Sequence, residues 1–292
     1  MPNGERKCSA GRLFDMRKVR FFRQNWFLVL IGGLVLFILT DWALNSTGNP
    51  NFLPTVILIG AFLVPVTFVF FIYHRVPPGE IPIPTVVVTF LWGGALGAVV
   101  AGILEYQTIR QLGIPQLFGV GLIEEAAKLI LPVAIFLRGR FRHEADGLLF
   151  GVAAGMGFAA LETMGYGFVS FLQSQGSVGT LNQTLLIRGL LSPVGHAAWT
   201  GIVCAALWRP RERLGHIAIT WTVFGTFILA IVLHASWDIL GSISSLVKSN
   251  LGWLDIIGIV VVGGISLWLL IRKIRMTHHG QVKIVTQGTS IS

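Results

Sequence analysis

Eight ionisable side chains lie inside four consecutive apolar segments of this 292-residue chain. They are Glu124, Glu125, Lys128, Glu162, Arg188, His196, His234 and Asp238. An ionisable group inside a bilayer costs at least a few kcal/mol, so each one is a functional hypothesis by default. Because all eight fall in four consecutive segments, we predict that they share one site.

The spacing of these residues indicates how they could act together. Glu124 and Lys128 are four residues apart, in the order that favours an ion pair on a helix. The adjacent Glu125 projects about 100° away around the same helix. His234 and Asp238 are also four residues apart, so the carboxylate could orient the imidazole or act directly.

The charges of this set do not balance. Four of the eight side chains are carboxylates, Lys128 compensates one of them, and Arg188 compensates a second only if it reaches the site. On its own, Arg188 is expected to be a snorkelling or interface residue. Two to three excess negative charges in a low-dielectric region require protons on carboxyl groups or a bound cation. Histidines with carboxylates form a suitable zinc ligand set, but the same count also fits a proton carrier.

The segments that must position these residues indicate an all-α, polytopic integral membrane protein. Hydrophobic residues make up 53% of the chain and charged residues only 12%, against about 25% charged in soluble domains. About eight segments are long enough to span a bilayer as helices. They are residues 26–44, 52–73, 84–106, 114–137, 145–172, 184–208, 218–240 and 253–271.

Basic residues predict the orientation of these spans. With the N-terminus in the cytoplasm, 18 of the 22 lysines and arginines lie on the cytoplasmic side and two on the outer side. Both termini are then cytoplasmic. This distribution at segment ends also argues against a nucleic-acid partner, despite the net charge of +9. We predict a basic tail at 1–25, an eight-helix membrane domain at 26–271 with a functional core at 114–240, and a cytoplasmic tail at 272–292.

Depth and packing follow from this topology. At a rise of about 1.5 Å per residue, Glu124 lies roughly 15 Å below the outer end of its span, and Glu162, His196 and His234 fall at overlapping depths. A site in the outer half of the membrane, open to the outside, is the simplest geometry. Glycines at every fourth position, Gly147, Gly151 and Gly155, predict a face where another helix packs closely.

Four motifs together resemble the PrsW-type intramembrane metalloprotease family. They are Glu124-Glu125-x-x-Lys128, then Asp146-Gly147 to Gly157-Phe158-Ala-Ala-Leu-Glu162, then His196-Ala-Ala-Trp-Thr-Gly201, and last Leu233-His234-Ala-Ser-Trp-Asp238. The resemblance covers Leu122 to Leu240. This family is distantly similar to the CAAX prenyl endopeptidases and the bacteriocin-processing membrane proteases. In the CAAX-like relatives the second motif ends in His, where this chain has Glu162.

The resemblance implies an endopeptidase that cuts a membrane-protein substrate in contact with membrane lipid, in a bacterial plasma membrane. In some relatives the substrate is a single-span anti-sigma factor, and the predicted depth places cleavage near the outer face. The implied catalytic residues are Glu124, Glu125, Glu162, His196, His234 and Asp238, supported by Lys128 and Phe158. The implied zinc ligands are Glu162, His196 and His234.

This resemblance suggests a hypothesis for the mechanism. One of Glu124 and Glu125 would act as general base on a water molecule. His196 and His234, with or without zinc, would polarise the scissile carbonyl and stabilise the oxyanion. Asp238 would orient His234.

Two alternatives use the same residues differently. A proton- or cation-coupled transporter also places carboxylates and histidines inside helices, although no internal repeat is evident in this chain. A non-catalytic membrane scaffold would bind client spans, but it has no need to bury a set of ionisable groups. Cleavage of a substrate, compared with pH flux across vesicles, separates the first alternative from a protease.

Overall fold

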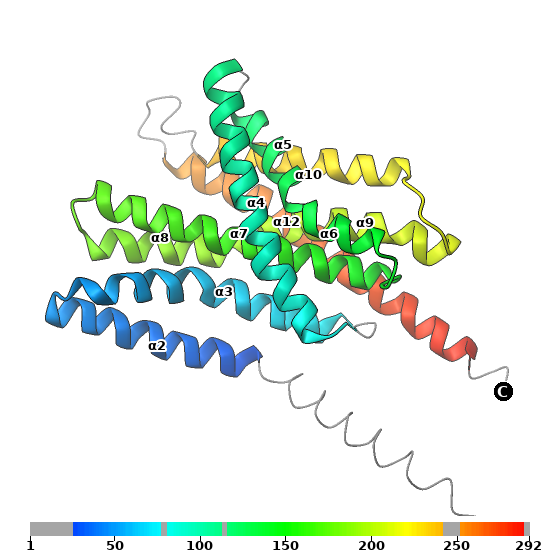
Figure 1. The fold of residues 1–292 in the computed structure, drawn as a ribbon, viewed down its shortest axis with the longest axis horizontal. Coiled ribbons are helices and arrows are strands. Elements are labelled where there is room, and N and C mark those ends of the chain that lie inside the picture. Colours follow the sequence, from blue (N-terminus) through cyan, green and yellow to red (C-terminus); the bar gives the residue numbers. More distant parts are fainter. Residues whose placement is uncertain (1–25, 77–80, 113–115, 242–251, 289–292) are drawn as a thin grey trace, which may run out of the picture.

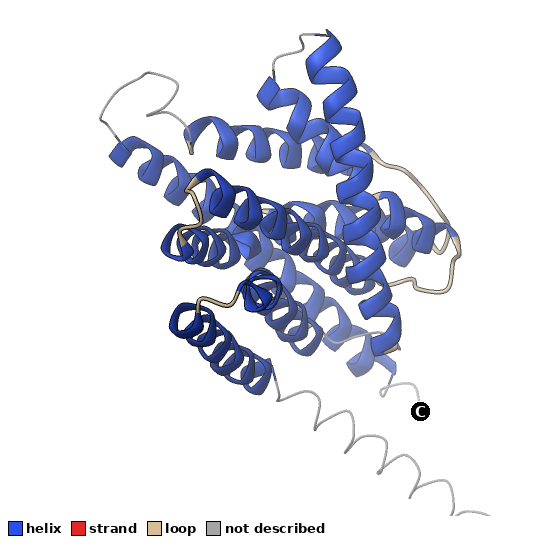
Figure 2. Ribbon diagram, turned by 60° about the vertical axis from the view of Figure 1, so that its left-hand side comes forward, coloured by secondary structure: helices blue, strands red, loops and turns tan. Residues whose placement is uncertain are grey.

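A computed structural model describes residues 26–76, 81–112, 116–241 and 252–288. These residues form helices and connecting loops only (Figure 2). The helices are α2 (Trp26–Thr47), α3 (Leu53–Arg75), α4 (Ile83–Leu112), α5 (Gln116–Lys128), α6 (Ile130–Leu137), α7 (Glu144–Gln173), α8 (Val178–Leu191), α9 (His196–Leu214), α10 (Trp221–Leu240) and α12 (Gly252–Gly288), with 3-10 turns η1 (Pro50–Phe52) and η2 (Ser192–Val194). The predicted all-α class is confirmed. The predicted tail at 1–25 lies outside the described residues.

Seven helical stretches in the described part of the chain are long and apolar enough to cross a membrane. They are Trp26–Thr47, Pro50–Arg75, Ile83–Thr108, Glu144–Gln173, Val178–Leu214, Trp221–Leu240 and Gly252–Thr277. The chain is therefore a polytopic membrane protein, as predicted. α12 continues as a helix beyond Ile271 to Gly288, where the sequence predicted the start of a tail.

The expected span at 114–137 is not one continuous helix. It is divided at Leu129 into α5 and α6. Pro132 explains the break, because a proline ring conflicts with the carbonyl four residues earlier, here that of Lys128, and offers no N–H to it. The Leu129 N–H instead bonds to the Ala126 carbonyl at 3.2 Å, a tighter turn. Lys128 thus becomes the last residue of α5.

The span predicted at 184–208 is also interrupted. Between α8 and α9 the chain passes through η2, which contains Pro193, and then through Gly195. Proline and glycine both disfavour a continuous helix here. As a result, His196 is the first residue of α9 rather than an interior residue of a straight span.

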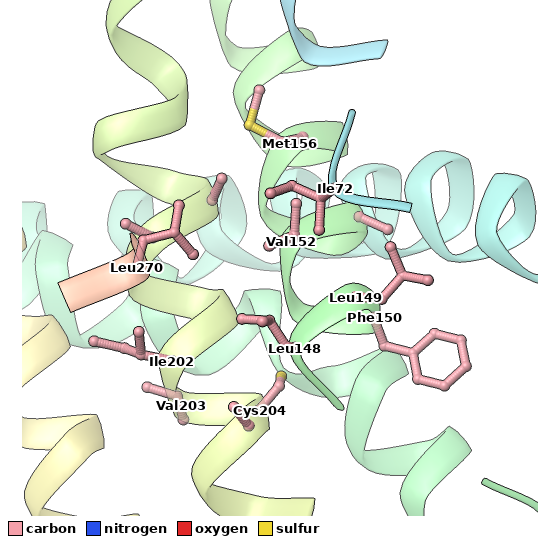
Figure 3. Packing of buried hydrophobic residues seen from close by; sticks show 14 of the residues in the cluster. Ile72, Leu148, Leu149, Phe150, Val152, Met156, Ile202, Val203, Cys204 and Leu270 are labelled. Atoms are coloured by element: carbon pink, nitrogen blue, oxygen red, sulfur yellow. The ribbon is translucent and has the colours of Figure 1, made fainter. Parts of the chain in front are cut away.

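Helix α7 lies at the centre of the bundle and packs against α3, α4, α8 and α9 (Figure 1). α4 crosses the neighbouring helices at a steep angle in the same view. Buried apolar side chains of α3, α7, α9 and α12 form the main core (Figure 3). The core includes Ile72, Leu148, Met156, Val203 and Leu270.

The predicted glycine face of α7 is in contact with α9. A Cβ atom on Gly147 would lie 2.6 Å from the Cys204 carbonyl oxygen, and one on Gly151 would lie 2.5 Å from that of Thr200. A Cβ on Gly155 would overlap the His196 carbonyl. The two backbones are therefore close enough to exclude any larger side chain. This contact fixes the position of His196 relative to α7.

The basic loops meet at one end of the bundle. The Glu144 carboxylate at the start of α7 pairs with Lys273 of α12 at 2.8 Å. The backbone N–H of Glu144 donates to the Glu212 carboxylate of α9 at 2.8 Å. Arg211 donates to the carbonyls of Phe136 and Gly139 in the α6–α7 connection. Three of the segments predicted to be cytoplasmic, namely the α6–α7 connection, the end of α9 and residue 273 of α12, are thus neighbours, far along α7 from Glu162.

Candidate metalloprotease site

Lys128 is the centre of a buried polar cluster. Its side chain is fully buried, and its Nζ lies 3.0 Å from Glu124 Oε2, 2.8 Å from Glu125 Oε1 and 2.9 Å from His196 Nδ1. The ammonium group also lies 4.3 Å from the centre of the Phe158 ring. The predicted Glu124–Lys128 pair is present, and Lys128 pairs with Glu125 as well. Its position at the C-terminus of α5 further favours a cation.

His234 of α10 is held on two sides. Its Nδ1 lies 2.9 Å from Glu125 Oε1, and its ring stacks on Trp199 with a centroid distance of 4.7 Å. An ionised carboxylate only accepts hydrogen bonds, so we assign the ring proton to Nδ1. Nε2 then faces Glu124 Oε2 at 3.6 Å and Asp238 Oδ2 at 3.7 Å. The predicted proximity of Asp238 to His234 is observed.

Glu162 of α7 lies between a histidine and an arginine. Its Oε2 is 3.2 Å from His196 Nε2, and its Oε1 is 2.9 Å from Arg188 Nη2. The expectation that Arg188 is a snorkelling or interface residue is therefore wrong. The break at η2 directs α8 so that Arg188 reaches the site, which no linear pattern indicated.

A cavity of about 480 Å³ opens at this cluster. Its wall includes five of the six predicted catalytic residues: Glu124, Glu162, His196, His234 and Asp238. Glu125 and Lys128 are not on the wall and support it from behind. The residues come from α5, α7, α9 and α10, and the structure brings them together at one cavity.

The site has a net negative charge. Glu124, Glu125, Glu162 and Asp238 are countered by Lys128 and, because it reaches Glu162, by Arg188. Two excess negative charges remain if all four carboxyls are ionised. That excess equals the charge of one divalent cation.

One set of three side chains in the described part of the chain could hold a metal ion. Ligand atoms of Glu124, Glu162 and His196 lie within 4.8 Å of one another. Glu162 Oε2 is buried and lies 3.2 Å from His196 Nε2, close enough for both atoms to bind one metal ion. These observations and the excess charge fit a bound divalent metal. The set differs from the one implied by the motifs, because it includes Glu124 and does not include His234.

Three further side chains shape the site and were not predicted. Trp199 packs on His234 and donates from Nε1 to Ser266 Oγ of α12 at 2.9 Å. Thr200 Oγ1 donates to Glu125 Oε2 at 3.4 Å. Tyr166 stacks under the Arg188 guanidinium. Trp199 and Thr200 lie within the His196 motif, and that proximity in sequence was the available signal.

Comparison with known proteins gives one match. A protein-family model described as PrsW family intramembrane metalloprotease matches residues 81–270. The match extends beyond the four motifs to include α4 and about half of α12. No curated protein and no solved structure gave a significant match.

Proposed function

This chain belongs to the PrsW family of intramembrane metalloproteases, and we propose that it cleaves a membrane-protein substrate in the cavity between α5, α7, α9 and α10. The observation that carries the proposal is the convergence on one cavity wall of five predicted catalytic side chains from four helices. The roles that we assign to individual residues rest on the distances between side chains at that wall.

We assign Glu162 and His196 to the metal, with Glu124 in reach of the same point. A divalent metal held there, for which zinc fits the mixed nitrogen and oxygen ligands, would polarise the scissile carbonyl. Arg188 holds Glu162 Oε1 and leaves Oε2 for the metal.

Glu124 is the general base in this proposal. Of the paired glutamates, it is the one on the cavity wall, whereas Glu125 is 1% exposed and is engaged by Lys128, His234 and Thr200. A base must be within hydrogen-bond reach of the proton that it takes, and of the two adjacent glutamates only Glu124 lines the cavity where a water could lie.

His234 passes the proton onward. Its Nε2 lies between Glu124 and Asp238 on the cavity wall, so it can receive a proton from Glu124 and donate it to the leaving amine. Glu125 fixes the orientation of the ring through Nδ1, and Asp238 supports its protonated form. Lys128 neutralises Glu125 and, through its contacts with Glu124 and His196, fixes the positions of these two side chains relative to each other.

The position of the site along the bundle suggests the substrate. Glu162 is 18 residues from the start of α7, roughly 27 Å from the end of the bundle where the basic loops meet. If those loops are cytoplasmic, the cavity lies in the outer half of the membrane. A single-span protein, of the anti-sigma-factor kind that some relatives cut, would then be cleaved near the outer face of a bacterial plasma membrane.

The test separates metal binding from proton transfer. Glu162→Gln and Glu124→Gln are purified with the wild-type protein, and bound metal and cleavage of a single-span reporter peptide are measured for each. We expect Glu162→Gln to lose metal and cleavage, and Glu124→Gln to retain metal while cleavage falls about 10²- to 10⁴-fold. Asp41→Asn on α2 is the matched carboxylate control. Wild-type cleavage by Glu124→Gln would overturn the assignment.

A further inference from the structure

Arg188 has no role in the motifs, yet it is a cationic side chain on the cavity wall. The other cation of the site, Lys128, is fully buried behind the wall, with its Nζ within 3.0 Å of Glu124, Glu125 and His196. A molecule that enters the cavity can therefore meet the guanidinium of Arg188 but not the ammonium of Lys128.

The guanidinium is held in a fixed orientation. Nη2 contacts Glu162 Oε1 at 2.9 Å, and the central carbon lies 3.9 Å from the centre of the Tyr166 ring. Stacking on an aromatic face together with an ion pair restricts the plane of the group. Such a group is preorganised to receive an acceptor in one direction.

The guanidinium also has unused donor capacity. It carries five N–H donors, and Nε is buried without a hydrogen-bond partner among the described residues. Because buried polar groups in native structures are nearly always paired, this unused donor capacity on a residue that lines the cavity favours an acceptor supplied from outside the chain. The side chain is 29% exposed, which leaves part of the group accessible to that acceptor.

We propose that Arg188 is a substrate-binding residue, whose guanidinium donates hydrogen bonds to an oxygen acceptor of the substrate next to the scissile bond. This proposal rests on the proposed protease function. The acceptor is a carbonyl or carboxylate oxygen, supplied either by the peptide backbone or by an acidic side chain. Because Glu162 Oε1 and the substrate oxygen share one guanidinium, Arg188 sets the distance between the bound peptide and the metal ligand.

The experiment compares Arg188→Lys with Arg272→Lys. Lysine preserves the positive charge beside Glu162 but lacks the planar set of donors. Arg272 is the matched control, because it also lies over an aromatic ring, that of Trp268, but does not line the cavity. Bound metal, kcat and KM are measured with a single-span reporter peptide that the wild-type protein cleaves, made with either Asp or Asn beside the cleavage site.

We expect Arg188→Lys to keep its metal and to raise KM about 10- to 100-fold, with kcat changed much less, as expected for loss of a charged hydrogen bond to bound substrate. Arg272→Lys should match the wild type. An increase in KM for both reporters identifies a backbone carbonyl, and an increase for the Asp reporter alone identifies an acidic side chain. An unchanged KM for both reporters, or a loss of cleavage that loss of metal accounts for, would overturn the proposal.

A binding measurement does not depend on turnover. In a Glu124→Gln background, addition of Arg188→Lys should weaken binding of the uncleaved reporter by the same factor. If Glu124→Gln cleaves the reporter normally, the proposed function fails irrespective of Arg188. If Glu124→Gln is inactive and the double variant binds as tightly as the single one, only the role of Arg188 fails.

Discussion

Helices α2 and α7 are both long enough to span a membrane, but they are used in opposite ways. In the most apolar window of α7, 83% of the residues are buried, whereas only 6% are buried in that of α2. Yet α2 is the more apolar of the two. α7 carries glycines, Asp146 and Glu162, while α2 presents large side chains such as Leu28, Leu36 and Trp42 to its surroundings.

The difference teaches that apolarity does not mark burial in this protein. Lipid tails are as apolar as leucine, so a lipid-facing helix gains nothing from polar or small residues. A helix that packs against other helices needs small residues for close approach and can pair its polar groups. The polar, glycine-rich helix is therefore the one at the centre, and it carries the site. Three pairs of substitutions and one single substitution test this comparison.

The largest difference in cleavage is expected between two variants that each replace a carboxylate by its amide, one in α7 and one in α2. Glu162→Gln in α7 should reduce cleavage by at least about 10²-fold and remove bound metal, because it deletes the oxygen that we assign as a ligand. Asp41→Asn in α2 should leave both unchanged. Metal analysis and a reporter assay check this, and treatment of the wild type with a chelator should reproduce the loss. Equal effects of the two substitutions would remove the distinction between the helices.

The next effect concerns leucines. Leu148→Ala in α7 removes a fully buried side chain and should reduce the free energy of unfolding by about 2–5 kcal/mol. Leu36 in α2 is 55% exposed. Leu36→Ala should reduce the free energy of unfolding by less than about 1 kcal/mol, because lipid or detergent replaces the lost contacts. Unfolding of both variants in the same detergent gives the comparison. A larger loss for Leu36→Ala would show that α2 packs against a partner.

A smaller effect is expected for glycines. Gly151→Ala places a methyl group 2.5 Å from the Thr200 carbonyl oxygen and should cost about 1–3 kcal/mol of unfolding free energy. It should also reduce cleavage, because α9 carries His196. Gly32 in α2 has no heavy atom within 4 Å of an added Cβ, so Gly32→Ala should be tolerated. Wild-type stability of Gly151→Ala would contradict the close approach of α7 and α9.

The smallest effect concerns a polar side-chain contact between α2 and α8. Asn182 Nδ2 donates to Asp41 Oδ1 at 2.7 Å. Asp41→Ala should cost about 0.6 kcal/mol, the average for such bonds between membrane helices, and should leave cleavage unchanged. Thermal unfolding in detergent measures the cost. A strong loss of cleavage would mean that α2 helps to position the site.

Much of the candidate site was predictable because ionisable residues inside a membrane span carry a large free-energy cost. Ionisable groups within apolar segments can be recognised directly in the sequence. The pairs Glu124–Lys128 and His234–Asp238 follow from the i,i+4 spacing of a single helix. Two features were not predictable. The contact of Glu125 with His234 joins residues 109 positions apart, and the salt bridge of Arg188 depends on how η2 redirects the chain.

The sequence by itself determined the all-α membrane class, the four segments that carry chemistry and the ionisable residues within them. These follow from hydropathy, helical period and the cost of buried charge, which are properties of each segment alone. The division between α5 and α6 has a local cause in Pro132, but only the tertiary structure decided that Glu124 rather than Glu125 lines the cavity and that Arg188 belongs to the site. These two features depend on close helix contacts, which are set by the packing of segments far apart in the chain.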